Sequence, residues 1–342
     1  MEPLELEGPR DDEVLVRIVA SGICHTDIDF MDSTRDVVLG HEGAGIVEQA
    51  GKEVKNFVKR GDHVVLSFRS CCLCRECLRG HPSGCEHFWE LNFGFARPDG
   101  SNALHASGVR GHFFGQSSFA TYALAAKSNI VKVSKGSALE YLAPLGCGIQ
   151  TGAGTVMNSL AVRKGQRVAV FGTGAVGLSA VMAARVVGAS PVIGVDLNPA
   201  RLKLALELGA THVIDSRRGD VLSRFAGIVK GGVDYALEIT GEPDIYKAAV
   251  DVLKPGGTVA LIASPDGAGL KDHLTGGRRS IGIIQGDAVP REFIPKLIRL
   301  HQRGMFPFDR LIKFYEFRDI NRAVRDAKSG KTIKPVLRMP PC

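Results

Sequence analysis

Residues 167–178 read RVAVFGTGAVGL. In this stretch an apolar run leads into Gly172, Gly174 and Gly177, which have the GxGxxG spacing. Such glycines allow a tight turn and let a pyrophosphate approach the free amides at a helix N-terminus. The next apolar run ends in Asp196, whose carboxylate can accept hydrogen bonds from ribose hydroxyls. The pattern predicts a turn that binds NAD rather than NADP, because Asp196 repels a 2′-phosphate; tight packing of the glycines alone is the alternative.

The sequence around this turn alternates between strand-like and helix-like segments. After residue 168, apolar runs alternate with helical stretches at 175–188 and 199–208, which predicts a parallel sheet with crossover helices. Before about residue 148, short strand-like runs are separated by glycine and polar clusters, which predicts a smaller β-rich domain with long loops. These runs cover 14–20, 44–48, 62–68 and 119–124, and the C-terminal part adds a helix at 292–303 and a strand at 333–339.

Composition excludes several classes of protein. The 342 residues are 44% apolar and 23% charged, which suits two globular domains. Glycines and Arg185 interrupt the longest apolar stretch, so we predict no membrane span. The N-terminus is acidic and lacks a secretory pattern, so we expect a cytoplasmic protein. The net charge of +7 comes from scattered basic residues and only 6% of residues are aromatic, so we expect no nucleic-acid partner.

Four of the eight cysteines form a closely spaced set. Cys71, Cys74, Cys77 and Cys85 have the spacing C-x2-C-x2-C-x7-C in a loop rich in Arg, Gly and Pro. Four thiolates can surround one tetrahedral Zn²⁺ and leave no position open for chemistry. The spacing therefore predicts a structural zinc site; unpaired cytosolic cysteines that cluster by chance are the alternative. Cys72 is out of phase with this set.

A second set of metal-ligand types is spread along the chain. Cys24 lies in GICHTD, His41 in LGHEG and Cys147 in PLGCGIQTG. Each by itself reads as a buried thiol or a core histidine. Together they offer two thiolates and an imidazole, which leave a tetrahedral Zn²⁺ with one open position, as catalytic zinc requires. Asp27 can hold the ring of His41 in its ligating tautomer.

These motifs, in this order, resemble those of the zinc-containing medium-chain alcohol dehydrogenases over essentially the whole chain. They are GxCHTD, GHExxGxVxxxG, the four-cysteine lobe, GCGxxTG and GxGxxG. Within that family the C-terminal stretches GDAVPREFIPKLI, FPFDRLIKFY and SGKTIKPVL resemble the bacterial aryl-alcohol dehydrogenases of the benzyl or geraniol type.

The resemblance implies an α/β protein with two domains and two zinc ions per chain. A GroES-like catalytic domain is expected at 1–148 and 285–342, and a Rossmann domain with a doubly wound parallel sheet at 149–284. The chain begins near the second or third strand of the family pattern, so we expect the first strand of the catalytic domain to be missing. The implied activity is interconversion of primary alcohols and aldehydes with NAD, in a homo-oligomer that is a dimer or a tetramer.

The resemblance also implies roles for single residues. Glu42 is expected behind the catalytic metal, and Thr26 is expected to take the alcohol proton. The expected cofactor contacts, beyond Asp196 and the three glycines, are His25, Thr151, Val176, Arg201 and Lys334. An ordinary solvated or capping residue is the alternative for each of them.

Phe113, Phe114 and Ile284 are expected to line the substrate cleft and to favour aromatic or allylic alcohols. For the two phenylalanines, a place in the core is the alternative. Two departures from the family pattern stand out: Asp29 occupies the usual position of a relay histidine, and the segment FMDSTRDVV before His41 is short and lacks prolines.

Two other functions compete with this interpretation. One is another branch of the family, such as a glutathione-linked formaldehyde dehydrogenase or a broad primary-alcohol enzyme. The other is a zinc-stabilised NAD-binding module without turnover.

Overall fold

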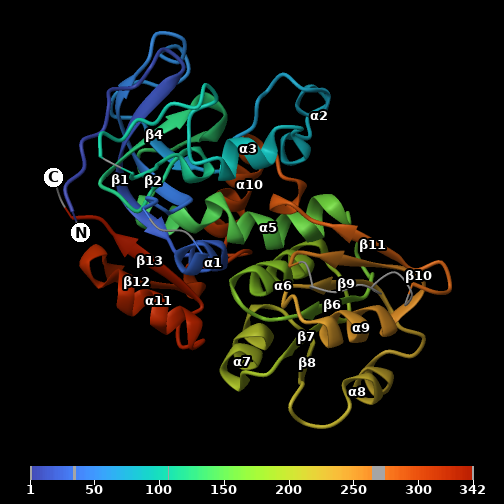
Figure 1. Cartoon of the computed structure of the whole chain (residues 1–342). Helices are drawn as coiled ribbons and strands as arrows, with labels where there is room; N and C mark the ends of the chain where they lie inside the picture. Colours follow the sequence, from blue (N-terminus) through green and yellow to red (C-terminus); the bar gives the residue numbers. More distant parts are fainter. Residues whose placement is uncertain (1, 34–35, 107, 264–273, 341–342) are drawn as a thin grey trace. The chain divides into compact units, whose positions relative to one another are not determined.

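The computed structural model describes residues 2–33, 36–106, 108–263 and 274–340 and divides into two compact units (Figure 1). The first unit comprises Met1–Gly148, Val289–Ile298 and Asp309–Cys342. The second comprises Ile149–Ala288 and Arg299–Phe308.

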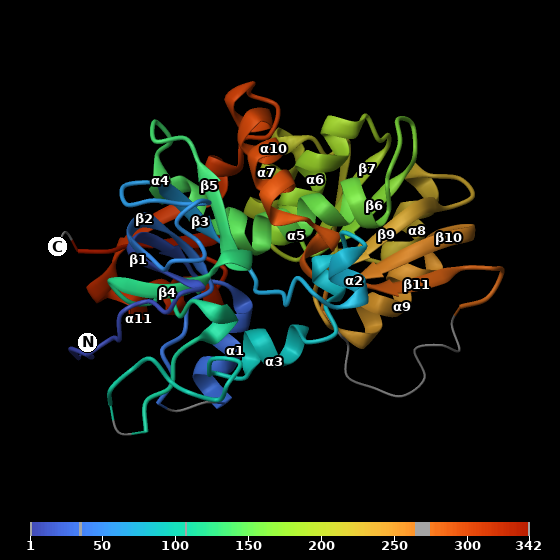
Figure 2. The same cartoon turned by 90° about the horizontal axis from the view of Figure 1, so that it is seen from above.

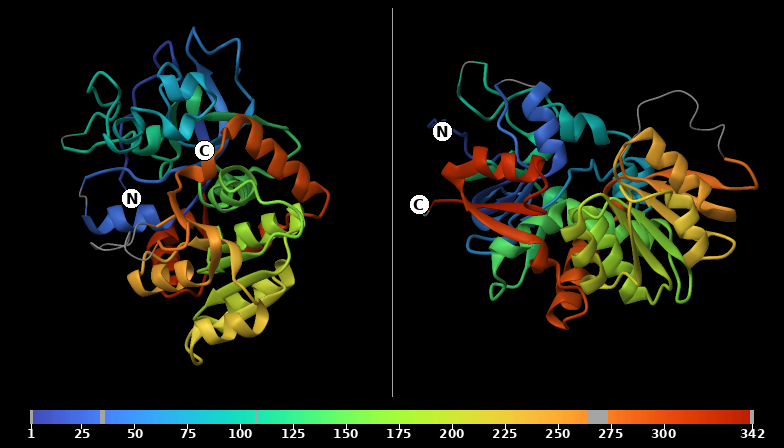
Figure 3. Two further views of the ribbon diagram at one scale, coloured as in Figure 1. Left: turned by 90° about the vertical axis from the view of Figure 1, so that its right-hand side faces the viewer. Right: turned by 90° about the horizontal axis from the view of Figure 1, so that it is seen from below.

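The first unit is built on a mixed sheet with the strand order β12-β13-β1-β2-β3-β5, in which β4 also pairs with β1. Along β1 the residues Val14, Val16, Ile18 and Ala20 are buried, so one face of the strand enters the apolar core. Figure 3 shows the blue β1 beside the red β13, the last strand described. The strands are β1 (Glu13–Gly22), β2 (Glu42–Ala50), β3 (His63–Leu66), β4 (Tyr122–Ala126), β5 (Ile130–Val133), β12 (Ile312–Glu316) and β13 (Lys334–Arg338).

Short helices and long loops cover this sheet. The amphipathic helix α11 places Ala323 in the same apolar core as Leu337 of β13. Most of the other helices that begin in this unit are short, whereas α10 has 13 residues and corresponds to the helix expected at 292–303. The helices are α1 (His25–Ser33), α2 (Arg75–Leu78), α3 (Phe88–Phe93), α4 (Leu139–Leu142), α10 (Pro290–Gln302) and α11 (Ile320–Lys328).

The second unit is built on a parallel sheet with the strand order β11-β10-β9-β6-β7-β8. Every residue of β6 and β7 is buried, as expected for central parallel strands with helices on both faces. Figure 2 shows these strands and the connecting helices. The strands are β6 (Val168–Phe171), β7 (Val192–Asp196), β8 (His212–Asp215), β9 (Val233–Glu238), β10 (Leu253–Leu261) and β11 (Arg279–Gly282); the helices are α5 (Gly148–Gly154), α6 (Ala175–Val187), α7 (Pro199–Leu208), α8 (Val221–Ile228) and α9 (Pro243–Asp251).

This strand order is the doubly wound Rossmann arrangement, which confirms the predicted fold class. The glycine-rich turn lies between β6 and α6, where the order of strands reverses. Gly172 has a φ of +92°, which only glycine adopts at little cost. A Cβ on Gly177 would lie 1.9 Å from the carbonyl oxygen of Gly172, so the close approach of helix and turn requires glycine there.

Several boundaries differ from the sequence-based expectations. Residues 285–288 and 299–308 fall in the second unit rather than in the catalytic domain expected at 285–342. For the first of these segments, Gln150 Nε2 donates to Gln285 Oε1 at 2.9 Å and Asn158 Nδ2 donates to the carbonyl of Gly286 at 3.1 Å. The strand expected at 119–124 is β4, which begins only at Tyr122. Phe119 N donates to the carbonyl of Leu39, so this part of the chain is held in a loop.

Candidate zinc and cofactor sites

In the first site, Asp27 holds the imidazole ring of His41. Asp27 lies in the first turn of α1 and is fully buried. Its Oδ1 lies 2.9 Å from His41 Nδ1 and accepts from Gly40 N at 3.1 Å, while its Oδ2 accepts from Cys24 N at 2.9 Å. Because a carboxylate only accepts, Nδ1 carries a proton, and Nε2 is the nitrogen that presents a lone pair when the imidazole is neutral. Burial lowers the pKa of His41, but the charge and hydrogen bond of Asp27 outweigh it and raise the pKa to about 10, so a metal must displace a proton from Nε2. Asp27 therefore orients the ring and joins the loops of Cys24 and His41.

The residues from three distant segments converge beside this ring. Cys24, His41, Glu42 and Cys147 each offer a ligand atom, and these atoms lie within 4.8 Å of one another. His41 Nε2 is buried and has no hydrogen-bond partner among the described residues. An unsatisfied imidazole nitrogen beside two thiols fits a zinc ion, which binds thiolate sulfur and neutral imidazole.

The carboxylate of Glu42 accepts hydrogen bonds from Lys334 and Gly148, so other protein groups satisfy it. Lys334 Nζ donates to Glu42 Oε1 at 2.8 Å and to Oε2 at 2.9 Å, and also to the carbonyl of Ile23 at 3.1 Å. Gly148 N donates to Glu42 Oε1 at 3.0 Å. Burial raises the pKa of Glu42, although the Lys334 charge opposes this effect. Lys334 thus has three hydrogen-bond acceptors within the protein, one for each ammonium proton. Its expected contact with the pyrophosphate of the cofactor stays a prediction.

The same surroundings favour the ionised form of Cys24. A hydrogen bond from the Cys147 thiol is the largest influence that holds the pKa of Cys24 well below its usual range. Burial opposes it, whereas His41 and the charge of Lys334 add to it. A thiolate is the form of cysteine that binds metals, so the pocket is prepared for a cation.

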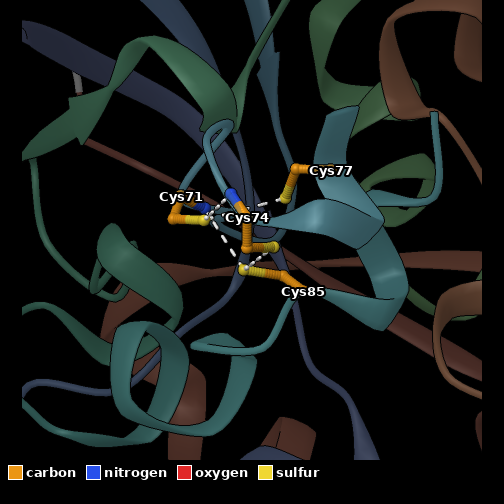
Figure 4. A group of neighbouring side chains, drawn as sticks. All are labelled: Cys71, Cys74, Cys77 and Cys85. Carbon is orange, nitrogen blue, oxygen red and sulfur yellow. Dashed lines mark hydrogen bonds between the residues drawn. The ribbon is translucent and has the colours of Figure 1, made fainter. Parts of the chain in front are cut away.

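The four-cysteine lobe forms a second, separate cluster (Figure 4). The Sγ atoms of Cys71 and Cys77 lie 3.9 Å apart, and those of Cys74 and Cys85 lie 4.0 Å apart. Four thiolates around tetrahedral zinc, with Zn–S bonds of about 2.3 Å, are separated by about 3.8 Å. The observed distances fit that geometry and are far longer than a disulfide bond.

Backbone amides and burial set the charge of this cluster. Hydrogen bonds from backbone amides, first that of Cys77, lower the pKa of Cys74 to about 6. Cys74 N in turn donates to Cys71 Sγ at 3.3 Å. Burial raises the pKa of Cys77 and of Cys85. A bound cation is therefore needed to make all four thiols ionise at neutral pH.

Aromatic rings enclose the His41 side of the first site. The ring of Phe114 stacks on His41 with centroids 4.4 Å apart and planes at 21°, and Phe113 meets it edge-on at 5.5 Å. Phe30 and Phe93 contact Phe113, at 5.2 Å and 5.9 Å between ring centroids. Phe113 and Phe114 are both buried.

In the second unit, Asp196 lies next to the glycine-rich turn. Its Oδ2 accepts from Thr173 N at 2.7 Å and from the Thr173 hydroxyl at 2.9 Å, and its Oδ1 accepts from Asn198 N at 2.8 Å. Arg201 Nη1 lies 4.0 Å from Asp196 Oδ2, and its buried Nε has no hydrogen-bond partner among the described residues. The predicted ribose-binding carboxylate and the predicted arginine thus share one end of β7.

The remaining predicted residues are divided between the two units. His25 and Thr26 open α1, where His25 is exposed and Thr26 is partly buried. Thr151 is buried in α5, and Val176 is partly buried in the first turn of α6. Ile284 is partly buried and precedes the turn at Gln285–Asp287.

Two positioning groups of the first unit were not predicted. Gln116 Nε2 donates to the carbonyls of His41 at 2.9 Å and Ser67 at 3.1 Å, and its Oε1 accepts from Gly43 N. Asn129 Nδ2 donates to the carbonyls of Ser67 and Phe114, each at 2.9 Å. Gln116 lies in the GHFFGQSS segment together with Phe113 and Phe114, but a side chain that holds backbone carbonyls has no signature in a single sequence.

Comparisons with known proteins agree with this geometry. Residues 10–135 match the family described as alcohol dehydrogenase GroES-like domain, and residues 175–303 match the family described as zinc-binding dehydrogenase. The chain is 46% identical to a geraniol dehydrogenase of Castellaniella defragrans, over 98% of this chain and 93% of the relative.

Two solved structures are similar over nearly their full length. One is an alcohol dehydrogenase zinc-binding domain protein from Burkholderia ambifaria, with a TM-score of 0.95 and 51% identity; the match covers 99% of this chain and 95% of that one. The other is a benzyl alcohol dehydrogenase from Acinetobacter calcoaceticus, with a TM-score of 0.94, 46% identity and the same coverage. Together with the two clusters of zinc-ligand residues, these matches show that the chain belongs to the zinc-containing, NAD-dependent alcohol dehydrogenase family.

Proposed function

We propose that this enzyme interconverts aromatic or allylic primary alcohols and their aldehydes, with NAD as the preferred nicotinamide cofactor. The observation that carries this proposal is the group of aromatic rings beside His41, in which Phe114 stacks on the imidazole and Phe113 meets its edge. An aryl group gains apolar burial there and ring contacts of about 0.5 to 1.5 kcal/mol per ring pair, and an allylic chain gains apolar burial; ethanol is too small for either. Two similar proteins are named for geraniol and benzyl alcohol.

Cys24, His41 and Cys147 are proposed to hold the catalytic zinc, and Cys71, Cys74, Cys77 and Cys85 the structural one. When bound, the catalytic zinc supplies Lewis acidity toward the alcohol or aldehyde oxygen. The hydrogen bond of Asp27 to Nδ1 leaves Nε2 as the nitrogen of His41 that binds the metal, and the negative charge of Asp27 makes Nε2 a stronger ligand. Glu42 places a carboxylate behind the cluster, where Lys334 holds it.

The Thr26 hydroxyl is proposed to take the proton that the alcohol loses. Its Oγ1 lies 3.9 Å from Cys24 Sγ, which places a hydroxyl beside one proposed zinc ligand. Exposed His25, the next residue toward the N-terminus, is proposed to contact the cofactor. In the second unit, Thr151, Val176 and the glycine-rich turn are proposed to bind the dinucleotide.

Asp196 and Arg201 are proposed to select the adenosine ribose of NAD. The Asp196 carboxylate is fixed by Thr173 and Asn198, so it is already oriented before a cofactor binds. A fixed negative charge pairs with ribose hydroxyls and opposes a 2′-phosphate.

A homo-oligomer, either a dimer or a tetramer, is proposed as the working form. In the parallel sheet β11 pairs only with β10 among the described strands, and its residues are exposed or partly buried. An edge of this kind can pair with another chain.

A cytoplasmic location is also proposed, since free thiols in two metal-ligand clusters suit a reducing compartment. No described helix is both long and apolar enough to cross a bilayer.

The substrate proposal is tested by kcat/KM values with NAD for benzyl alcohol, cinnamyl alcohol, geraniol, S-hydroxymethylglutathione and ethanol. We expect benzyl alcohol and geraniol to exceed ethanol by at least about tenfold, the equivalent of about 1.4 kcal/mol. Phe113→Ala and Phe114→Ala should reduce that ratio.

Phe68→Leu is a matched control, because Phe68 is a buried phenylalanine of the same unit that contacts Phe88 and makes no ring contact with His41. Zinc content is measured for each variant, so that lost metal is not mistaken for lost recognition. Equal kcat/KM values for ethanol and benzyl alcohol would contradict the aryl assignment and leave the family assignment unchanged.

A further inference from the structure

A cavity of about 690 Å³ opens beside the four-cysteine lobe, within the first unit. Its wall includes Arg69, Ser70, Lys127, Ser128 and Arg291. None of these residues belongs to the proposed catalytic site or to the predicted cofactor site. The cavity is therefore distinct from both proposed sites.

Arg69 is the unusual member of this wall. Only 7% of its surface is exposed. Its backbone is fully satisfied by Asn92, which accepts from Arg69 N at 2.8 Å and donates to its carbonyl at 2.9 Å. Among the residues that the structure describes, however, no group accepts a hydrogen bond from its guanidinium and no carboxylate forms an ion pair with it. Burial lowers the pKa of Arg69. Its guanidinium nitrogens are not among the fully enclosed polar atoms without a partner, so they reach the cavity, and a ligand there that accepts its N–H groups would offset the cost of burying the charge.

Two more cations line the same cavity. Arg291 stacks on Phe57, with its Cζ 4.4 Å from the ring centroid, and donates to the carbonyls of Ile130, at 3.3 Å, and of Lys127. Lys127 lies on the same ring, 5.8 Å from its centroid. Neither cation forms an ion pair with a described carboxylate. The Ser128 hydroxyl accepts from Ser70 N at 3.4 Å, so its own proton is available to a ligand.

The remaining charged groups leave the cavity positive. Asp12 and Glu90 also line it, and Glu90 Oε2 lies 3.6 Å from His87 Nδ1. Three permanent cations therefore face two carboxylates. The buried position of Arg69 makes its charge the least screened of the three.

We propose that this cavity binds a small oxyanion, a phosphate or a carboxylate, with Arg69 as its main ligand. The planar guanidinium of Arg69 offers two parallel N–H groups to the oxygens of the anion. Lys127 and Arg291 add positive charge that attracts the same anion. The anion stabilises the turn at Lys127–Asn129, whose Asn129 holds the carbonyl of Phe114. The proposal is independent of the identity of the alcohol substrate.

The test uses the zinc-loaded enzyme with saturating NAD, so that the pyrophosphate site is already filled. Inorganic phosphate, sulfate and succinate are each titrated at constant ionic strength while the melting temperature is measured. We expect a saturable rise of about 2 to 4 °C for at least one of them and none for chloride. Comparison of phosphate with succinate tells whether the natural ligand is a phosphate or a carboxylate.

Arg69→Met separates a binding role from a structural one. If Arg69 binds the anion, this variant shows no rise in melting temperature when anions are added. In anion-free buffer it melts at a higher temperature than wild type, because an unpaired buried charge has been removed. Arg79→Met is the control, since Arg79 is an exposed arginine of the same lobe that does not line the cavity. It should keep the full rise.

Lys127→Met provides a second variant and should weaken the rise without removing it. Zinc content is checked throughout. An unchanged rise in Arg69→Met, the absence of a saturable rise with all three anions, or a lower melting temperature of Arg69→Met in anion-free buffer would each overturn the proposal.

Discussion

Asp27 Oδ1 lies 2.9 Å from Nδ1 of His41, and both residues are completely buried. The other oxygen of the same carboxylate accepts from Cys24 N. One side chain thus fixes the ring of one proposed zinc ligand and the backbone of another.

Asp27→Asn should therefore weaken zinc binding at the catalytic site. An amide in this position turns an NH₂ group toward one of the donors that Asp27 now accepts from, which disturbs His41 or Cys24. We expect zinc affinity to fall about 10- to 100-fold, measured by chelator competition. Asp29→Asn is the control, because Asp29 is exposed on the same helix. Equal zinc affinities for the two variants would contradict the assigned role.

Each chain should bind two zinc ions, one in each cluster. Cys147→Ser should lose one zinc and its activity but keep most of its stability, whereas Cys77→Ser should lose one zinc together with stability and yield, because structural zinc contributes to folding. Elemental analysis and thermal melting measure both effects. Cys72→Ser, a change outside both clusters, should keep two zinc ions. A single zinc in wild-type protein that Cys147→Ser retains would refute the two-site assignment.

Asp196→Ser should shift the cofactor preference from NAD toward NADP. Hydrogen bonds to a charged group contribute about 1.5 to 3 kcal/mol, so we expect the ratio of kcat/KM values for the two cofactors to change by about 10- to 100-fold. Asp215→Ser is the matched control: Asp215 ends the neighbouring strand β8, directly opposite Asp196 in the register. An Asp196→Ser enzyme with an unchanged ratio would show that another group selects the cofactor.

His112 should make the fold less stable in weak acid. Burial, supported by the charge of Arg97 and opposed by Glu13, lowers the pKa of His112 to about 4. The unfolded chain then binds the additional proton below pH 6.5, so stability is lost as the pH falls from about 6.5 toward 4, by about 3 kcal/mol at most.

The measurement is the melting temperature of wild type and His112→Asn between pH 7.5 and 5.5. Asparagine is suitable because residue 112 has a φ of 62°, which asparagine tolerates. The variant should lose less stability than wild type over this range. His105→Asn, at an exposed histidine, should follow wild type. Parallel curves for wild type and His112→Asn would disprove the assignment.

The sequence by itself determined the local features of this protein. GTG at 172–174 followed by Gly177 specified the Rossmann turn, because the positive φ of Gly172 and the close backbone approach at Gly177 demand glycine at these two positions. The spacing of Cys71, Cys74, Cys77 and Cys85 predicted a closed cluster, because all four lie in one short loop. Alternation of apolar residues predicted strands such as β1 within a few residues.

Only the tertiary structure decided which distant groups meet. Cys24 and Cys147 are 123 positions apart in the sequence, and the fold alone brings their sulfurs to one site with His41. The Lys334 contact with Glu42, the Gln116 clamp on the carbonyl of His41 and the unpartnered guanidinium of Arg69 have no local pattern. Each depends on strand pairing and loop packing between remote segments, and the identity of a polar residue does not reveal which group satisfies it.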